Sequence, residues 1–287
     1  MRTMLLMLLL ALAALPLGCT ADNEGTEPMP GPSQPVVPDV TGLWTVTFTG
    51  LESLGEDNTE QPLVFMPRAA DEYRVLNADP GLLGTAAAGE ESLTVTIDAE
   101  VEFGASTYQF AGQLTGAATD DAFSLAGQLG FTLNDGPDTD QLDGASDDVT
   151  LTATRSETAP AAAAAPDLAG EWAMTFTYAD PPADWSDVED ADVTLELLEP
   201  DVFAMSIDGR GVVAGLAVIG TRAYALGSDD GEHSESTYTE TLVARCDVST
   251  TEITGDASIS FSLDSGDDAE ELDGTAMTFT IEGAKSQ

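Results

Sequence analysis

The fold of this chain is decided by a stretch that occurs twice, as DVTGLWTVTFT at residues 39–49 and as DLAGEWAMTFT at residues 167–177. Both copies read Asp, an apolar residue, one residue, Gly, one residue and Trp, followed by alternation that ends in Phe-Thr. A stretch that returns so closely predicts a duplicated unit.

Further matches extend the repeat over the whole of both copies. Ser106-Thr107-Tyr108 returns at residues 236–238, Phe131-Thr132-Leu133 returns as Phe-Ser-Leu at 261–263, and Leu142-Asp143-Gly144 returns at 272–274. Order and spacing agree throughout, so the sequence predicts two tandem domains. We place them at residues 39–157 and 167–287, with an Ala/Pro linker at residues 158–166, and each has an ordinary domain size.

Within each copy, apolar residues recur at every second position. Trp44, Val46 and Phe48 alternate with threonines, and a longer run alternates from Phe123 to Leu133. This period, broken by acidic turn clusters, is typical of half-buried antiparallel strands. We therefore expect an all-β protein made of two small up-and-down barrels with seven to nine strands each. A β-sandwich is the alternative.

The Gly-x-Trp motif favours the barrel over the sandwich. Gly42-Leu43-Trp44 and Gly170-Glu171-Trp172 resemble the motif that opens the first strand of lipocalins. In that family the tryptophan plugs the closed end of the barrel, and a basic residue late in the last strand stacks on it. The resemblance assigns these roles to Trp44 with Arg155 and to Trp172 with Lys285. The Thr-Asp-Tyr motif and the C-terminal helix of many lipocalins are missing, and simple core packing explains the tryptophans equally well.

The barrel interiors decide whether a ligand fits. A barrel of about eight strands holds one small ligand or is filled by its own side chains. Small residues that would leave space are Gly127, Ala153, Gly255 and Ala257, and bulky residues that would remove it are Phe123, Phe131, Phe261 and Phe279. Tyr108 and Tyr238 are either polar contacts of a cavity or core residues with hydroxyls at the rim.

The N-terminal segment predicts export. Arg2 precedes an apolar run from Met4 to Leu15, which is too short to span a bilayer and reads as a signal peptide at residues 1–18. Its end, Leu-Pro-Leu-Gly-Cys19, resembles the lipobox of bacterial lipoproteins. The resemblance implies lipid attachment at Cys19 and, because Thr20 follows, an outer-membrane location in the cell envelope. An ordinary cleaved signal is the alternative. A proline-rich tether is predicted at residues 19–38.

The net charge of the chain limits the kinds of molecule that it can bind. The chain has 52 acidic and 8 basic residues, which gives a formal net charge of −44. Such a surface repels nucleic acids, so we expect no nucleic-acid binding. It favours solubility and attracts cations, and the acidic turns at 138–144 and 264–273 are candidate cation sites. The first of these turns lacks the EF-hand spacing, so we assign no metal ligands.

No residue pattern indicates catalysis. His233 is the only histidine, and the chain has no Gly-x-Ser-x-Gly elbow, phosphate loop or dinucleotide motif. Cys246, within a strand-like run, reads as a small apolar core residue. We expect a protein that is not an enzyme and has no cofactor.

Two functions therefore remain open at this point. In the first, one or both barrels of a lipid-anchored envelope protein bind a small apolar ligand. In the second, the domains form a structural or interaction module of the cell surface with acidic, cation-binding loops. The loops at 50–62 and 179–191 differ most between the copies, and we expect the function to lie near them.

Overall fold

A computed structural model of the protein describes residues 37–286 except 55–58, 79–80, 104, 139–140, 161–163, 180–185, 209, 234–235 and 267–271. The predicted signal segment, Cys19 and nearly all of the tether lie outside the described residues. Residues 35–287 belong to one compact unit. Within the described residues, no helix has the length and apolar character needed to cross a membrane.

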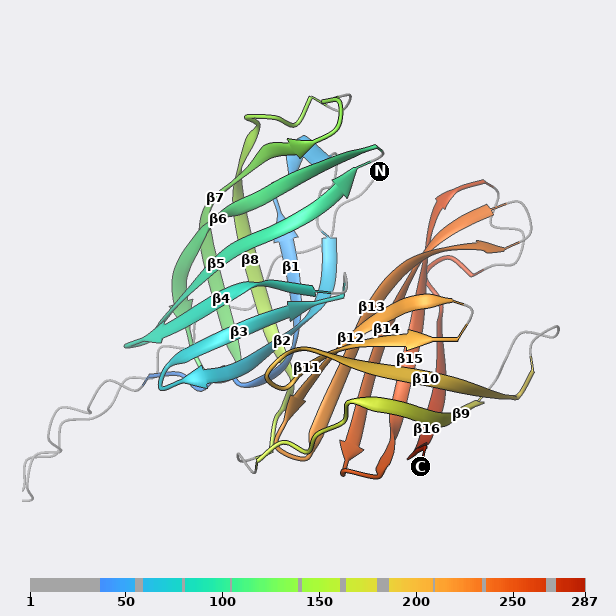
Figure 1. Cartoon of the computed structure of the whole chain (residues 1–287). Helices are drawn as coiled ribbons and strands as arrows, with labels where there is room; N and C mark the ends of the chain where they lie inside the picture. The colour runs from blue at the N-terminus through green and yellow to red at the C-terminus, as the bar shows by residue number, and fades with distance from the viewer. Residues whose placement is uncertain are drawn as a thin grey trace, which may run out of the picture. The chain divides into compact units, whose positions relative to one another are not determined.

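The first copy forms a closed barrel of eight antiparallel strands (Figure 1). The strands are β1 (Gly42–Thr49), β2 (Thr59–Ala69), β3 (Glu72–Asn77), β4 (Gly81–Gly89), β5 (Ser92–Phe103), β6 (Ser106–Ala118), β7 (Ala122–Asp135) and β8 (Ser146–Thr158), with a short 3-10 helix, η1 (Glu52–Leu54), after β1. Each strand pairs with the next, and β8 pairs with β1 to close the barrel.

The second copy repeats this topology. Its strands are β9 (Gly170–Tyr178), β10 (Val188–Glu199), β11 (Val202–Ile207), β12 (Gly211–Ile219), β13 (Arg222–His233), β14 (Ser236–Val248), β15 (Glu252–Ser265) and β16 (Ala276–Lys285). Pairing of β16 with β9 closes the barrel. The prediction of two tandem up-and-down barrels is confirmed, and the sandwich alternative is wrong because each sheet closes on itself and leaves no sheet edge to pack against a second sheet.

The strand registers of the two barrels correspond. In the first barrel Phe65 pairs with Val75, and in the second Leu195 pairs with Met205. Likewise, Thr96 pairs with Gln113 in the first barrel, and Leu226 pairs with Val243 in the second. In both examples the two residues of the second pair lie 130 positions after those of the first. From the second strand onward, every residue of the first barrel therefore has its counterpart 130 positions later, and in the first strand 128 positions later.

Alternation of side chains builds the two cores, as the period of two predicts. In β1, Trp44, Val46 and Phe48 are buried inside the barrel, and Thr45, Thr47 and Thr49 lie on the outer side of the strand. In β9, Trp172, Met174 and Phe176 take the corresponding inner positions. Each barrel thus has its own apolar interior, and the contents of these interiors differ.

Candidate binding cavity in the second barrel

One end of the first barrel contains the Trp44 indole. Its ring is fully buried, and its Nε1 donates a hydrogen bond to the carbonyl of Val40 at 2.8 Å. The Arg155 guanidinium lies 4.9 Å from the ring centroid. Arg155 also donates to the carbonyl oxygens of Thr41, at 2.9 Å, and of Asp39. The basic side chain thus binds the segment that leads into β1.

The second barrel has the same arrangement with a lysine. Trp172 is fully buried and its Nε1 donates to the carbonyl of Leu168 at 2.8 Å. The Lys285 ammonium lies 5.7 Å from the ring centroid and 3.4 Å from the carbonyl of Asp167. A cation over an indole face contributes about 0.5–2 kcal/mol. These four side chains lie at corresponding positions of the two barrels, and neither Trp172 nor Lys285 lines the cavity described below.

Large aromatic side chains occupy the interior of the first barrel. The rings of Trp44, Phe65 and Phe123 contact one another, with centroid separations of 4.9–6.1 Å. Farther along the barrel, Phe110 and Phe131 stack with centroids 4.8 Å apart. These contacts fill space that a ligand would need.

The second barrel has smaller residues on the inner faces of two adjacent strands. Leu93, Val95 and Ile97 of β5 and Leu114 of β6 are buried in the first barrel. Their counterparts on β13 and β14 are Ala223, Ala225, Gly227 and Ala244. The second barrel thus has three methyl groups and a hydrogen where the first has four branched side chains. Its side chains fill less of the interior beside this part of the wall.

A cavity of about 150 Å³ lies in the second barrel beside these small residues. Its wall is mainly apolar and includes Met174, Phe176, Leu195, Leu216, Phe279 and Ile281. Ala225, Gly227 and Ala244 are among the lining residues. The cavity therefore follows from the difference between the two copies, since the first barrel has bulkier residues at these positions.

Polar residues line the cavity at the end remote from Trp172. Glu189 accepts hydrogen bonds from the hydroxyl of Tyr178 at 3.3 Å and from Arg210 at 3.0 Å. Burial, followed by the charge of Glu189, raises the pKa of Tyr178 to about 12. At neutral pH this hydroxyl is therefore a hydrogen-bond donor that fixes the Glu189 carboxylate.

Two further carboxylates lie at the same end of the cavity. Asp229 and Glu240 are direct cross-strand partners on β13 and β14, and both line the cavity. Phe110 occupies the position of Glu240 in the first barrel. With Glu189 this makes three acidic residues and one arginine, Arg210, among the described residues that line this end of the cavity, so acidic groups predominate there.

Cys246 also lines the cavity. The side chain is a buried free cysteine on β14. Burial raises the pKa of its thiol to about 12, so the group is a neutral thiol at neutral pH. It is an apolar wall element, because nucleophilic or metal-binding chemistry requires the thiolate.

The glycines that the sequence predicts as interior space leave no such space. Gly127 and Gly255 were expected to leave room, but the backbones of β6 and β14 lie against them. A Cβ atom at Gly127 would be 2.0 Å from the Gln113 carbonyl oxygen, and one at Gly255 would be 2.1 Å from that of Arg245. Glycine in these strands allows close approach of a neighbouring strand and not an opening.

The tyrosines that were considered as ligand contacts are core residues. Tyr108 is fully buried and its hydroxyl donates to Asp138 at 2.9 Å. Tyr238 is fully buried and is not among the cavity-lining residues. The tyrosine at the cavity, Tyr178, follows directly after the repeated opening stretch, and its hydroxyl reaches across to β10.

Carboxylates of the acidic turns bind backbone groups. Asp138 accepts hydrogen bonds from the amides of Leu142, at 2.9 Å, and Asp143, at 3.3 Å, and Asp143 accepts one from the amide of Leu133 at 3.0 Å. Within the part of the chain that the structure covers, no three or more His, Cys, Asp or Glu side chains gather as a metal site would require. Much of the second acidic turn, residues 267–271, and the side chain of His233 lie outside the described residues.

Comparisons with known proteins identify no family. No family model matches the chain, and no curated protein matches it. Among solved structures, the chain is similar to a protein of unknown function from the DUF3598 family of Nostoc punctiforme PCC 73102. The identity is 13%, and the match covers 85% of this chain and 96% of the other, with a TM-score of 0.21. A likeness at this score carries no argument about function.

Proposed function

We propose that the chain is a lipid-anchored protein of the cell envelope whose second barrel binds one small, largely apolar molecule. The observation that supports the binding proposal is the apolar cavity of about 150 Å³ in that barrel. The first barrel, with its aromatic interior, serves as a structural partner. The lipid anchor rests on the sequence around Cys19.

The size of the cavity limits the ligand. Pockets for drug-sized ligands measure about 300–1,000 Å³, whereas a dry apolar cavity of about 150 Å³ accommodates a molecule the size of benzene. The ligand is therefore a single ring or a short alkyl chain, or a longer molecule of which only one end enters. Any polar head group would remain at the mouth.

The charge at the mouth limits the head group. Glu189 is already hydrogen-bonded to Tyr178 and Arg210, and Asp229 and Glu240 lie next to each other on adjacent strands. A carboxylate head group would add a further acidic group beside these three acidic residues. We therefore infer a neutral or cationic head group.

A panel of six-carbon probes tests the binding proposal. Hexylamine, hexanol and hexanoate share one alkyl chain and differ in charge, and benzene tests the cavity alone. We expect benzene, hexanol and hexylamine to raise the melting temperature of the chain from residue 20 onward, and hexanoate to have no effect. A ligand at a hundred times its Kd stabilises by about 2.7 kcal/mol. Absence of any shift, or an equal shift with hexanoate, would contradict the proposal.

The anchor has its own test. Replacement of Cys19 by Ser should release the protein from the membrane fraction of its host, because the lipid attachment site is lost. Retention of the variant on membranes would refute the lipid anchor and would leave the binding proposal untouched.

An interaction module with cation-binding acidic turns is the second candidate. The aromatic interior of the first barrel favours it for that domain. Melting that depends on calcium, in the absence of any effect of the apolar probes, would favour this candidate over ligand binding.

A further inference from the structure

The two barrels contact each other through one apolar surface from each. The β1–β3 face of the first barrel consists of Leu43, Val64, Met66, Leu76 and Ala78. The β11–β13 face of the second barrel consists of Val202, Ala217, Ile219, Tyr224 and Leu226. All ten residues are buried in one shared cluster, although they lie on the outer surfaces of their own barrels.

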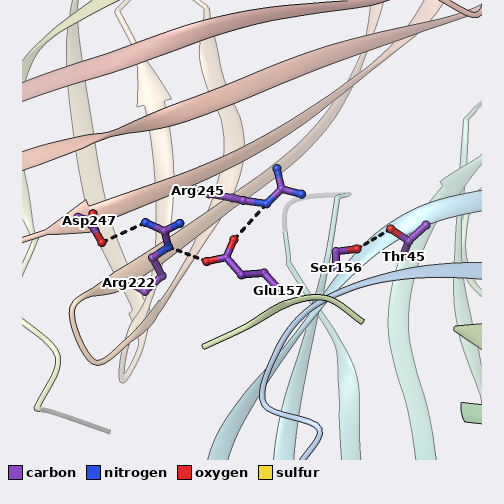
Figure 2. A network of polar contacts seen from close by, with 6 residues as sticks. All are labelled: Thr45, Ser156, Glu157, Arg222, Arg245 and Asp247. Carbon is purple, nitrogen blue, oxygen red and sulfur yellow. Dashed lines mark hydrogen bonds and ion pairs between the residues drawn. The ribbon is translucent and has the colours of Figure 1, made fainter. Parts of the chain in front are cut away.

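A network of ion pairs that joins the two barrels lies beside this cluster. Glu157, near the end of β8, contacts two arginines of the second barrel, with 2.9 Å to Arg222 Nε and 3.3 Å to Arg245 Nε (Figure 2). Arg222 also pairs with Asp247 at 3.0 Å. Only about a quarter of the Glu157 side chain is exposed. Charge-assisted hydrogen bonds in such a partly buried setting are stronger than fully exposed ion pairs.

A local irregularity positions Glu157. Trp44 pairs with Arg155 and Leu43 pairs with Glu157, so the register shifts by one residue and Ser156 is the extra residue of a bulge. The Ser156 and Thr45 hydroxyls are hydrogen-bonded at 2.7 Å, which ties the bulge to β1 (Figure 2). Glu157 therefore lies beside Leu43, at the border of the β1–β3 face.

The second barrel does not repeat the β1–β3 face. The residues at the corresponding positions of the second barrel are Glu171, Thr194, Glu196, Ser206 and Asp208. A polar or charged residue thus stands in the second barrel at each of the five positions that are apolar in the β1–β3 face. A surface with three carboxylates cannot bury against an apolar face without a large desolvation penalty.

The first barrel likewise does not repeat the β11–β13 face. The residues at the corresponding positions of the first barrel are Glu72, Ala87, Gly89, Thr94 and Thr96. The two arginines that bind Glu157 are also specific to the second copy, since Ser92 and Thr115 stand at their positions. Each barrel therefore has one of the two faces and lacks the other.

This asymmetry determines how copies can associate. A contact between unlike faces of repeated units continues into a closed ring or an open filament when every unit has both faces. Here the first barrel offers only the β1–β3 face and the second offers only the β11–β13 face. Terminal units of repeat arrays characteristically have such polar outer surfaces.

We propose that the β1–β3 and β11–β13 faces form a specific recognition surface between unlike barrels, so that the barrels remain bound to each other without the linker and pairs of barrels do not polymerise. The partner of each barrel is the other repeat, and not a second copy of itself. Glu157, between two guanidinium groups, sets the orientation of the pair.

Cleavage of the linker in the folded protein tests this proposal. A protease recognition sequence is inserted at residues 160–165 of the chain that starts at residue 20, and the purified protein is cut and examined by size-exclusion chromatography with light scattering. We expect the two halves to elute together with the mass of one chain at micromolar concentration. Separate elution of the halves, or masses above that of one chain, would overturn the proposal.

Substitutions at the interface show whether the observed faces cause the association. Leu43→Glu installs the residue found at this position of the second barrel, and Glu157→Arg places a third cation between Arg222 and Arg245. Each should weaken association of the cleaved halves by at least about tenfold. Glu90→Arg, in the exposed β4–β5 turn, changes the charge equally and should have no effect.

Combining Glu157→Arg with Arg222→Glu shows whether a loss of association comes from the lost charge pairing or from a folding defect. The double variant should regain part of the lost association, because opposite charges again face each other. Association that is unchanged in Leu43→Glu and in Glu157→Arg, with circular dichroism showing both variants folded, would show that the halves bind through some other surface.

Discussion

Filling the cavity of the second barrel is the most direct test of how the two copies diverged. The double variant Ala225→Val, Ala244→Leu installs the residues that the first barrel has at these positions, Val95 and Leu114. It adds five carbon atoms next to an empty volume of about 150 Å³. The variant should therefore be more stable and should lose ligand binding.

The size of the effect follows from the added apolar groups. Five buried carbons contribute at most about 4 kcal/mol at about 0.8 kcal/mol each. Imperfect fit in a packed core costs about 1–3 kcal/mol. We expect a net stabilisation of about 1–3 kcal/mol, which corresponds to a rise in melting temperature of about 2–12 °C for a protein of this size.

Thermal melting with and without hexylamine measures both effects. The variant should melt at a higher temperature than the native chain and should show no further rise with hexylamine. Ala173→Leu, which adds a side chain to the exposed outer surface of β9, is the control and should change neither. A destabilised variant that still responds to hexylamine would refute the conclusion that the four small residues create the binding space.

Three further outcomes are expected. Leu114→Ala in the first barrel should lower the free energy of unfolding in urea by about 2–5 kcal/mol, because it opens a cavity in a filled interior. Cys246 should react with thiol reagents only after denaturant is added, since burial raises its pKa to about 12, and labelling of the native protein would contradict its buried position. Burial raises the pKa of Tyr178 and Tyr224 to about 12, from an ordinary value of 10. Because the folded state favours the neutral phenol, the stability that these two tyrosines contribute is complete below pH 10 and is lost as the pH rises through 12. An ultraviolet titration in which all five tyrosines of the native protein ionise near pH 10 would contradict this prediction.

The fold could be predicted from the sequence because two independent signals agreed. Alternation around Trp44 and Phe123 gave strands, and the return of the motif at Trp172 gave two domains. Closure into barrels depended on the resemblance of Gly-x-Trp, because a period of two alone is equally typical of a sandwich.

The cavity could not be located from residue types taken one at a time. Gly127 and Gly255 are small, but the carbonyl groups of neighbouring strands lie against them. The informative signal was the comparison between copies, in which Leu114 corresponds to Ala244. That comparison requires the register of the strands, and the register is known only once the pairing is known.

The contact between the barrels also left a signal in the sequence. Leu63-Val64-Phe65-Met66 is apolar at four consecutive positions and interrupts the alternation of the first copy. Strands that are buried on both faces read as continuous apolar runs. The structure explains this run, since Leu63 and Phe65 face the barrel interior while Val64 and Met66 face the second barrel.

The basic residues of this acidic chain are nearly all engaged by other groups. Seven of the eight lie within residues 37–286, and six of these seven bind a carboxylate or a backbone carbonyl: Arg74, Arg155, Arg210, Arg222, Arg245 and Lys285. Trypsin-like proteases cut after Lys and Arg, and they need the chain around the cut to be unfolded and accessible. In this protein most of those positions lie inside hydrogen-bonded strands. The same scarcity of cations that makes the surface acidic thus leaves the folded protein with very few points at which such a protease could begin to digest it.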